Sequence, residues 1–500
     1  MSSKHSLFQQ RMSRRAFLRL AGVGSGAALL AACGNAVAPA SAPPPATSAS
    51  APTNAPPATS APVATAAPTT AAEQVTLSFW TPGGSDAFCK GFGTIAENYH
   101  KVNPNVTIGP ANCYAGQQSF REVLLANIAS GTPPDSTIVW ESPIAYAVRG
   151  ALEPLDDLMA HSKYSQVSNW PAGVLASCQF KGKTYGLPAT AGSYAIYFNA
   201  EMFESKGVST KPEDFPKTWD DLRKLSKEFT FWRGDTLETM GFFPFTAPGA
   251  LGGDGAVEIA IWSALNGTQL FDEKNLKYTL DSPENIEMMQ YAVDWLNEEY
   301  KGDLVKVQTT ANWAGYTDSQ GRAPMWQEGK FAMLTQGFWF STDMYATEMK
   351  FQNWSAAQHP VGPSGKSTAS GYWPNWLVIP KGSKHVQEAF DYLDYMGVEG
   401  IKVWFANVPD IPANTLVPAD LVPKTLAEKR GADFAKTMTT FFRKQLDVAT
   451  PMWTSPVQDF GNDQISKALE QILSKTATPK DALGEAQRAA QAELEKALKG

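Results

Sequence analysis

The clearest run of apolar positions lies between residues 184 and 222. Its centre, residues 194–198 (YAIYF), is aromatic and β-branched and is bounded by glycine and proline, which predicts a buried strand. Asn199 suits the N-cap of a helix that Gly207 ends, and a second helix is predicted from residue 219. We expect the rest of the chain to be organised around this strand.

Upstream of it, short β-branched runs alternate with helical patterns. The predicted order is strand 75–80, helix 88–100, strand 106–108, helix 119–130, strand 135–140 and helix 143–148. Such alternation favours mostly parallel sheets with right-handed crossovers. Ligands bind beyond the carboxyl ends of the strands in such sheets, which selects Ser85, Asp86 and Glu141 as candidates. Asp86 and Glu141 fit the role of helix N-cap groups equally well.

The first 33 residues have the pattern of an export signal. They contain five basic residues and no acidic one, and then a run of small apolar residues at 21–32 that is too short for a lasting membrane span. Residues 13–18 (SRRAFL) look like a twin-arginine signal. Residues 30–33 (LAAC) look like a bacterial lipobox, with lipidation of Cys33. The alternative is an ordinary secretory signal with an incidental cysteine.

Residues 34–73 are almost entirely Ala, Pro, Ser and Thr. A segment of this composition cannot bury enough apolar surface to offset its loss of conformational entropy. We therefore expect a disordered tether, which reaches on the order of 100 Å when extended.

The remainder of the chain is acidic and large. The 500 residues contain 42 basic and 49 acidic residues, and removal of the signal leaves a formal charge of −12. This charge argues against nucleic-acid binding and against a basic face for membrane docking. The length after residue 73 is sufficient for two lobes.

Three cysteines remain after the signal. Cys89 and Cys113 are the nearest pair and each follows a predicted strand, so they are the expected partners if a disulfide forms after export. Cys178 is then expected to be a buried apolar residue. No CxxC motif or Cys/His cluster occurs, so neither a metal nor a cofactor is expected.

Several motifs, in order and at similar spacing, make the chain resemble the extracellular solute-binding proteins of ABC-type sugar importers. They are VTLSFW (75–80), ASGTPPD (129–135), GALEPL (150–155), YGLP (185–188), TWDDL (218–222), EGKFAM (328–333) and TPKDAL (478–483). The resemblance covers essentially the whole chain after residue 73.

The resemblance implies an α/β fold of the periplasmic-binding-protein type II. Each of its two lobes would be a mixed, mostly parallel sheet flanked by helices, with a hinged cleft between the lobes. The N-terminal lobe would comprise residues 74–190 and 371–425, and the C-terminal lobe residues 191–370 and 426–500. The chain would cross between them near residues 190–193 and 365–371, and once more at an unplaced position between 408 and 431.

A saccharide offers hydroxyls to polar side chains and C–H faces to aromatic rings. Position in the family's motifs suggests Trp339 and Trp453 as stacking residues. Further candidates lie at or near the crossings and loops; they are Gln117, Ser193, Tyr194, Trp262, Gly371 and Trp373. The alternative for each tryptophan is core packing, and for Ser193 and Tyr194 a purely structural role.

No catalytic motif accompanies these residues. The chain lacks an HExxH helix, a GxSxG elbow, a dinucleotide fingerprint and a complete phosphate loop. Paired carboxylates can still meet in a fold whatever their sequence spacing.

We therefore expect a monomeric, lipid-anchored binding protein on the outer face of the cell membrane, periplasmic or extracellular, and no enzyme. It would capture an oligosaccharide and deliver it to an ABC permease. The alternatives are a secreted, membrane-tethered carbohydrate-active enzyme, or the same fold carrying a polyol, a glycerol phosphoester or a peptide.

Overall fold

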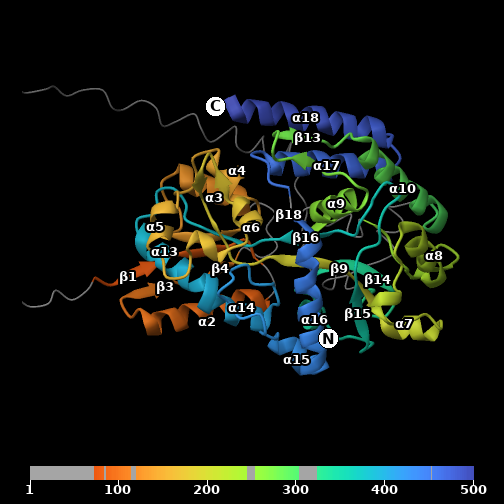
Figure 1. Cartoon of the computed structure of the whole chain (residues 1–500), viewed down its shortest axis with the longest axis horizontal. Helices are drawn as coiled ribbons and strands as arrows, with labels where there is room; N and C mark the ends of the chain where they lie inside the picture. Colours follow the sequence, from red (N-terminus) through yellow and green to blue (C-terminus); the bar gives the residue numbers. More distant parts are fainter. Residues whose placement is uncertain are drawn as a thin grey trace, which may run out of the picture. The chain divides into compact units, whose positions relative to one another are not determined.

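The computed structural model describes residues 73–83, 86–113, 120–244, 254–302, 324–451 and 453–499. The chain divides after Thr70, and Ala71–Gly500 is one compact unit, whose elements are labelled in Figure 1. The expected signal with Cys33 and nearly all of the expected linker lie outside the described residues, as do Ser85 and Gln117.

The first of two five-stranded sheets has the strand order β4-β2-β5-β17-β8. Its central strands β5 and β17 are buried throughout. The five strands are β2 (Phe79–Thr81), β4 (Asn112–Cys113), β5 (Ser136–Val139), β8 (Leu187–Pro188) and β17 (Trp376–Val378).

The strand predicted over residues 75–80 is two strands in the structure. The backbone N and the Oγ of Ser78 both donate to Asp135 Oδ2 at 2.8 Å, and this side-chain contact interrupts the ladder. Before Ser78, β1 (Val75–Leu77) pairs in parallel with β3 (Val106–Ile108), and after it β2 joins the first sheet.

The second sheet has the order β14-β9-β16-β18, and β15 also pairs with β9. The strand β9 (Gly192–Asn199) contains the predicted residues 194–198 and is buried along its whole length, as its continuous apolar pattern indicates. The other strands are β14 (Met333–Gly337), β15 (Trp354–Ala357), β16 (Ser370–Trp373) and β18 (Ala449–Pro451).

Both sheets are mixed, but the expected predominance of parallel pairing is wrong for the described strands. Parallel pairs join β2 to β4, β2 to β5 and β16 to β18. By contrast, β17 is antiparallel to both its neighbours, and β9 is antiparallel to β14, β15 and β16. The alternation of strands and helices that suggested parallel pairing lies before residue 150. It gives no information about the direction of later strands, such as β17, that the chain enters directly from the other sheet.

The helices begin and end close to the predicted positions where the sequence has capping residues. The side chain of Asn199 accepts from Met202 N at 3.1 Å, and that of Thr218 accepts from Asp221 N at 3.2 Å. The helices are α2 (Asp86–Val102), α3 (Phe120–Ala129), α4 (Pro143–Ala147), α5 (Asp156–Ala160), α6 (Ala172–Ala176), α7 (Ala200–Ser205), α8 (Trp219–Phe229), α9 (Asp254–Leu265), α10 (Pro283–Glu299), α12 (Phe340–Asp343), α13 (Val386–Tyr395), α14 (Ile401–Asn407), α15 (Lys424–Arg430), α16 (Ala432–Gln445), α17 (Gln458–Leu473) and α18 (Pro479–Lys499).

Three short antiparallel ribbons lie outside the two five-stranded sheets. They are β6 (Gln179–Phe180) with β7 (Lys183–Thr184), β10 (Phe231–Arg233) with β11 (Thr236–Thr239), and β12 (Phe271–Asp272) with β13 (Lys277–Tyr278).

Buried apolar side chains form two clusters. One is centred on the first sheet and includes Phe79 and Leu377. The other contains the core around β9 and also Leu124 of α3 and Tyr146 of α4. Apolar contact therefore continues from the second sheet to helices that cover one face of the first.

Candidate functional site at the junction of the two sheets

Three segments of chain meet between the two sheets. Residues 189–191 connect β8 of the first sheet to β9 of the second, and residues 374–375 connect β16 back to β17. A third segment, residues 410–413, lies against the first one. Ala191 N donates to Ile411 O at 2.6 Å, and the N–H of residue 413 donates back to the carbonyl of residue 189 at 3.1 Å.

The first crossing was predicted at residues 190–193, and the sheets change between Pro188 and Gly192. The second was predicted near residues 365–371. Instead, β16 (Ser370–Trp373) is still part of the second sheet, so the chain crosses only before Trp376. Gly371 lies within β16, in register with Thr450 of β18.

Asn375 joins the three segments. Its Nδ2 donates to Thr190 Oγ1 at 2.8 Å and to Asp410 Oδ2 at 3.3 Å, and its Oδ1 accepts from Trp140 Nε1 at 2.9 Å. Asn375, Thr190 and Asp410 are all buried. One buried amide thus fixes the relative positions of all three segments, which suits a hinge region.

Trp339 lies directly beside this junction, after the end of β14. It is half-buried and packs edge-on against Tyr194 with ring centroids 5.1 Å apart. Two glycines make room for its indole. A Cβ on Gly192 would lie 2.7 Å from Trp339 Cζ3 and 3.0 Å from Asp410 Oδ1, and a Cβ on Gly337 would lie 2.2 Å from the same ring.

Trp373 is half-buried at the end of β16, in register with Gly192. Ser193 and Tyr194, which were predicted to contact the ligand, follow Gly192 and are both buried. Ser193 Oγ donates to Phe442 O at 2.7 Å, and Tyr194 is 1% exposed. The junction therefore brings Trp339, Trp373 and Tyr194 together, while the hydroxyl of Ser193 holds helix α16 against β9.

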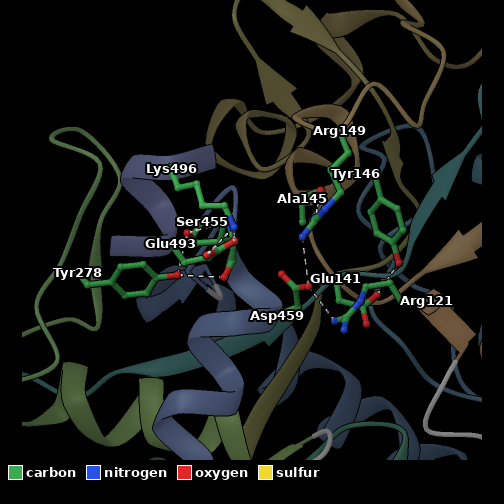
Figure 2. Close-up of polar contacts among 11 residues, drawn as sticks. Arg121, Glu141, Ala145, Tyr146, Arg149, Tyr278, Ser455, Asp459, Glu493 and Lys496 are labelled. Carbon is green, nitrogen blue, oxygen red and sulfur yellow. Dashed lines mark hydrogen bonds and ion pairs between the residues drawn. The ribbon is translucent and has the colours of Figure 1, made fainter. Parts of the chain in front are cut away.

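Trp262 and Trp453 are buried in the second core. Trp262 is 1% exposed and its ring lies 4.5 Å from that of Trp219. Trp453 is 4% exposed and meets Tyr278 edge-on at 5.6 Å. The hydroxyl of Tyr278 donates to Ser455 Oγ at 2.8 Å, as Figure 2 shows. In this structure both tryptophans fill core space, which was the alternative considered for each.

Glu141 follows β5 and is half-buried. Its Oε2 accepts from the hydroxyl of Tyr146 at 2.9 Å (Figure 2). Burial, and then the nearby carboxylate of Glu141, raise the pKa of Tyr146 well above its usual value, so Tyr146 remains a neutral donor. Asp86 is the first residue of α2, and Ser85 and Gln117 are outside the described residues.

With this geometry established, comparison with known proteins is informative. Residues 90–402 match the family of bacterial extracellular solute-binding proteins. The chain belongs to this family.

Two relatives illustrate how much of this solute-binding chain is similar to known proteins. A maltooligosaccharide ABC transporter solute-binding lipoprotein of Streptococcus pneumoniae R6 is 28% identical over 241 residues, which is 47% of this chain and 50% of the relative. The match thus spans about half the length of that relative. An arabinooligosaccharide-binding protein of Bacillus subtilis 168 is 23% identical over 432 residues, 83% of this chain and 91% of the relative.

Solved structures show the same fold. The solute-binding chain is similar to CpMnBP1 with mannotriose bound, with a TM-score of 0.67 and 24% identity over 83% of this chain and all of that one. The substrate-binding protein Lmo0181 of Listeria monocytogenes, solved with cycloalternan, has a TM-score of 0.67 at 18% identity, covering 85% of this chain and 100% of that chain. The two-lobed α/β fold of the family is therefore confirmed.

The solute-binding chain has a disulfide between Cys89 of α2 and Cys113 of β4, the pair nearest in sequence. It ties the first turn of α2 to the end of β4. Cys178 is free and buried, and its burial raises the pKa of the thiol.

Sequence reasoning missed the cluster formed by Trp140, Thr190, Asn375 and Asp410. The signals for it were positional: Trp140 ends a predicted strand immediately before Glu141, and Thr190 begins the predicted first crossing. Within the described residues there is no group of acidic, histidine or cysteine side chains arranged to hold a metal ion. No described helix combines the length and the apolar character needed to cross a membrane.

Proposed function

We propose that this solute-binding protein captures an oligosaccharide between its two sheets and delivers it to an ABC importer. The observation that carries the proposal is the half-buried Trp339, held in space left by Gly192 and Gly337 at the point where the chain passes between the sheets. An aromatic face at such a junction suits the C–H face of a sugar ring. The relatives named for maltooligosaccharide and arabinooligosaccharide support the same ligand class.

The proposed lobes follow from the sheets. The first sheet draws its strands from residues 79–188 and 376–378, and the second from residues 192–373 and 449–451. Because β16 belongs to the second sheet, we propose the N-terminal lobe as residues 74–190 and 374–425 and the C-terminal lobe as residues 191–373 and 426–500. Hinge motion at the three crossings would close the lobes over the sugar.

The proposed anchor is a lipid on Cys33 after export through the twin-arginine route. The lipobox at residues 30–33 and the Ala/Pro/Ser/Thr segment that follows support this placement, since they would hold the folded part at a distance from the membrane. The permease subunits would be separate chains, and the proposed state of this chain is a monomer without a metal or cofactor.

Titration of the purified protein with malto-, arabino- and manno-oligosaccharides tests the function. Tryptophan fluorescence is followed during titration, and the sugar is then recovered and identified by mass spectrometry. Saturable quenching with the sugar intact is the expected result. Shortened or unsaturated sugar that accumulates with time would instead show that the protein is a carbohydrate-active enzyme. Saturable binding of only a polyol, a phosphoester or a peptide would show that the protein carries that compound and not a sugar.

A further inference from the structure

Three polar contacts join helix α17, beside the second sheet, to helix α3 and to residues that flank helix α4, beside the first. Asp459 Oδ2 lies 3.4 Å from Arg121 Nη1 and 3.4 Å from Arg149 Nη2. Next to it, Gln458 Oε1 accepts from the backbone N of Ser142 at 3.0 Å. Figure 2 shows Asp459 between the two arginines.

Several features of its surroundings position the side chain of Asp459. It lies in the first turn of α17, where the helix dipole favours a negative charge. Its side chain is 12% exposed, against 25% for Arg121 and 39% for Arg149. Arg149, two residues after the end of α4, also donates to the carbonyl of Ala145 within that helix, which restricts the guanidinium. Solvent screens the two arginines in part, so each ion pair alone is weak.

A second carboxylate, Asp463, lies one turn further along α17. Burial raises the pKa of Asp463, Arg121 lowers it, and Asp459 and Glu122 raise it again. The cluster therefore has two arginines and Glu122 on the first-sheet side and two carboxylates on the second-sheet side. The ion pairs of Asp459 with the two arginines are the attractive contacts between the sides.

None of these residues belongs to the three crossing segments. A rotation about the crossings that moved the sheets apart would therefore change the distance from α17 to α3 and α4, and would break all three contacts together. Gln458 is fully buried, so its separation from Ser142 N would also expose a polar contact that is now enclosed.

We propose that Asp459, with Arg121 and Arg149, is a latch that stabilises the closed arrangement of the two sheets and thereby sets ligand affinity. This inference rests on the proposed function for its effect on saccharide binding. A ligand that binds only the closed form has an apparent Kd equal to the intrinsic Kd divided by the closed fraction. Loss of the latch lowers that fraction and weakens binding without any change in the residues that touch the sugar.

The test uses Asp459→Asn, which keeps the shape of the side chain and removes its charge. Spin labels at Lys101→Cys in α2 and Lys224→Cys in α8, both exposed, report the distance between the two sides in the unliganded protein. The expected result is a shift to longer distances together with a roughly 5- to 30-fold weaker saccharide Kd. The matched control is Glu485→Gln, which removes a carboxylate paired with Lys467 across α17 and α18, on one side only.

A double-mutant cycle separates a latch from a loss of stability. In a latch, Arg149→Gln weakens binding in the wild-type background but has little further effect once Asp459 is Asn. Unchanged label distances in Asp459→Asn, an unchanged Kd, or equal effects from Glu485→Gln would each overturn the proposal. If no saccharide binds the wild type, the proposed function fails, while the label distances still decide whether the latch exists.

Discussion

At the scale of single residues, the account depends on where aromatic rings lie. Trp339 and Trp453 were both predicted from motif position, but the structure leaves Trp339 half-buried at the junction and encloses Trp453 at 4% exposure. Both rings pack closely against glycines, Trp339 against Gly192 and Gly337 and Trp453 against Gly461. The difference lies in their place in the fold, because Trp339 lies at the junction of the sheets and Trp453 lies inside the second core with Tyr278. The sequence pattern around each tryptophan does not contain that information.

Trp339→Ala should weaken saccharide binding by about 2 kcal/mol, roughly thirtyfold in Kd, because a stacked indole at the centre of an interface contributes disproportionately. Trp339→Phe should restore part of this loss, since it keeps an aromatic face. Calorimetric titration measures both. Trp232→Phe, in the ribbon of β10 and β11, is the matched control, and an unchanged Kd in Trp339→Ala would remove this tryptophan from the site.

His359 should make the protein less stable in acid. It is 2% exposed, and burial lowers its pKa to about 3, so it is neutral in the folded protein while the unfolded chain binds a proton near pH 6.5. The unfolded state then binds more protons between those values, and stability falls as pH falls through this window, by about 2 kcal/mol from pH 7 to pH 5. Urea unfolding of the wild type and of His359→Gln checks this. Equal pH slopes for the two proteins would contradict it.

At the scale of helices and strands, local sequence signals predicted where the elements begin. Contacts between residues far apart in the sequence determined how the strands pair. Asn199 was predicted as an N-cap and caps α7, and α8 begins at the predicted residue 219, directly after its cap Thr218. The break at Ser78 depends on Asp135, which is 57 positions away, and no local pattern contains it. The hydrogen bonds of Asn375 to Trp140 and Thr190 span 235 and 185 positions, which is why the crossing beside Asn375 was predicted too early.

Asn375→Ala should lower the free energy of unfolding by about 2 to 3 kcal/mol, because it leaves the buried groups of Trp140, Thr190 and Asp410 without this partner. The midpoint and slope of urea unfolding measure the change. Asn297→Ala, at an exposed position of α10, serves as the control. If the urea midpoint of Asn375→Ala shifts no more than that of Asn297→Ala, the side-chain amide of Asn375 does not stabilise the crossing segments.

At the scale of the whole molecule, order and spacing of weak motifs predicted the fold. No single motif was specific, yet together they identified a family that residues 90–402 match. What the sequence could not predict was how the sheets meet. The junction consists of segments near residues 190, 375 and 411, and their contacts arise only in the folded chain.

Export and anchoring are also properties of the whole molecule. Cys33→Ser should release the protein from the membrane into the soluble fraction, because the lipid on Cys33 is the proposed attachment. Cell fractionation with metabolic labelling by a fatty acid measures this, and Cys178→Ser is the control. Membrane retention of unlabelled Cys33→Ser protein would show a different anchor.

The most direct test of the central claim is a crystal structure of this chain with the tightest-binding oligosaccharide. We predict a sugar ring stacked on the indole of Trp339, between the sheet that contains β5 and the sheet that contains β9. A sugar bound elsewhere on the molecule, with Trp339 free of it, would contradict the account.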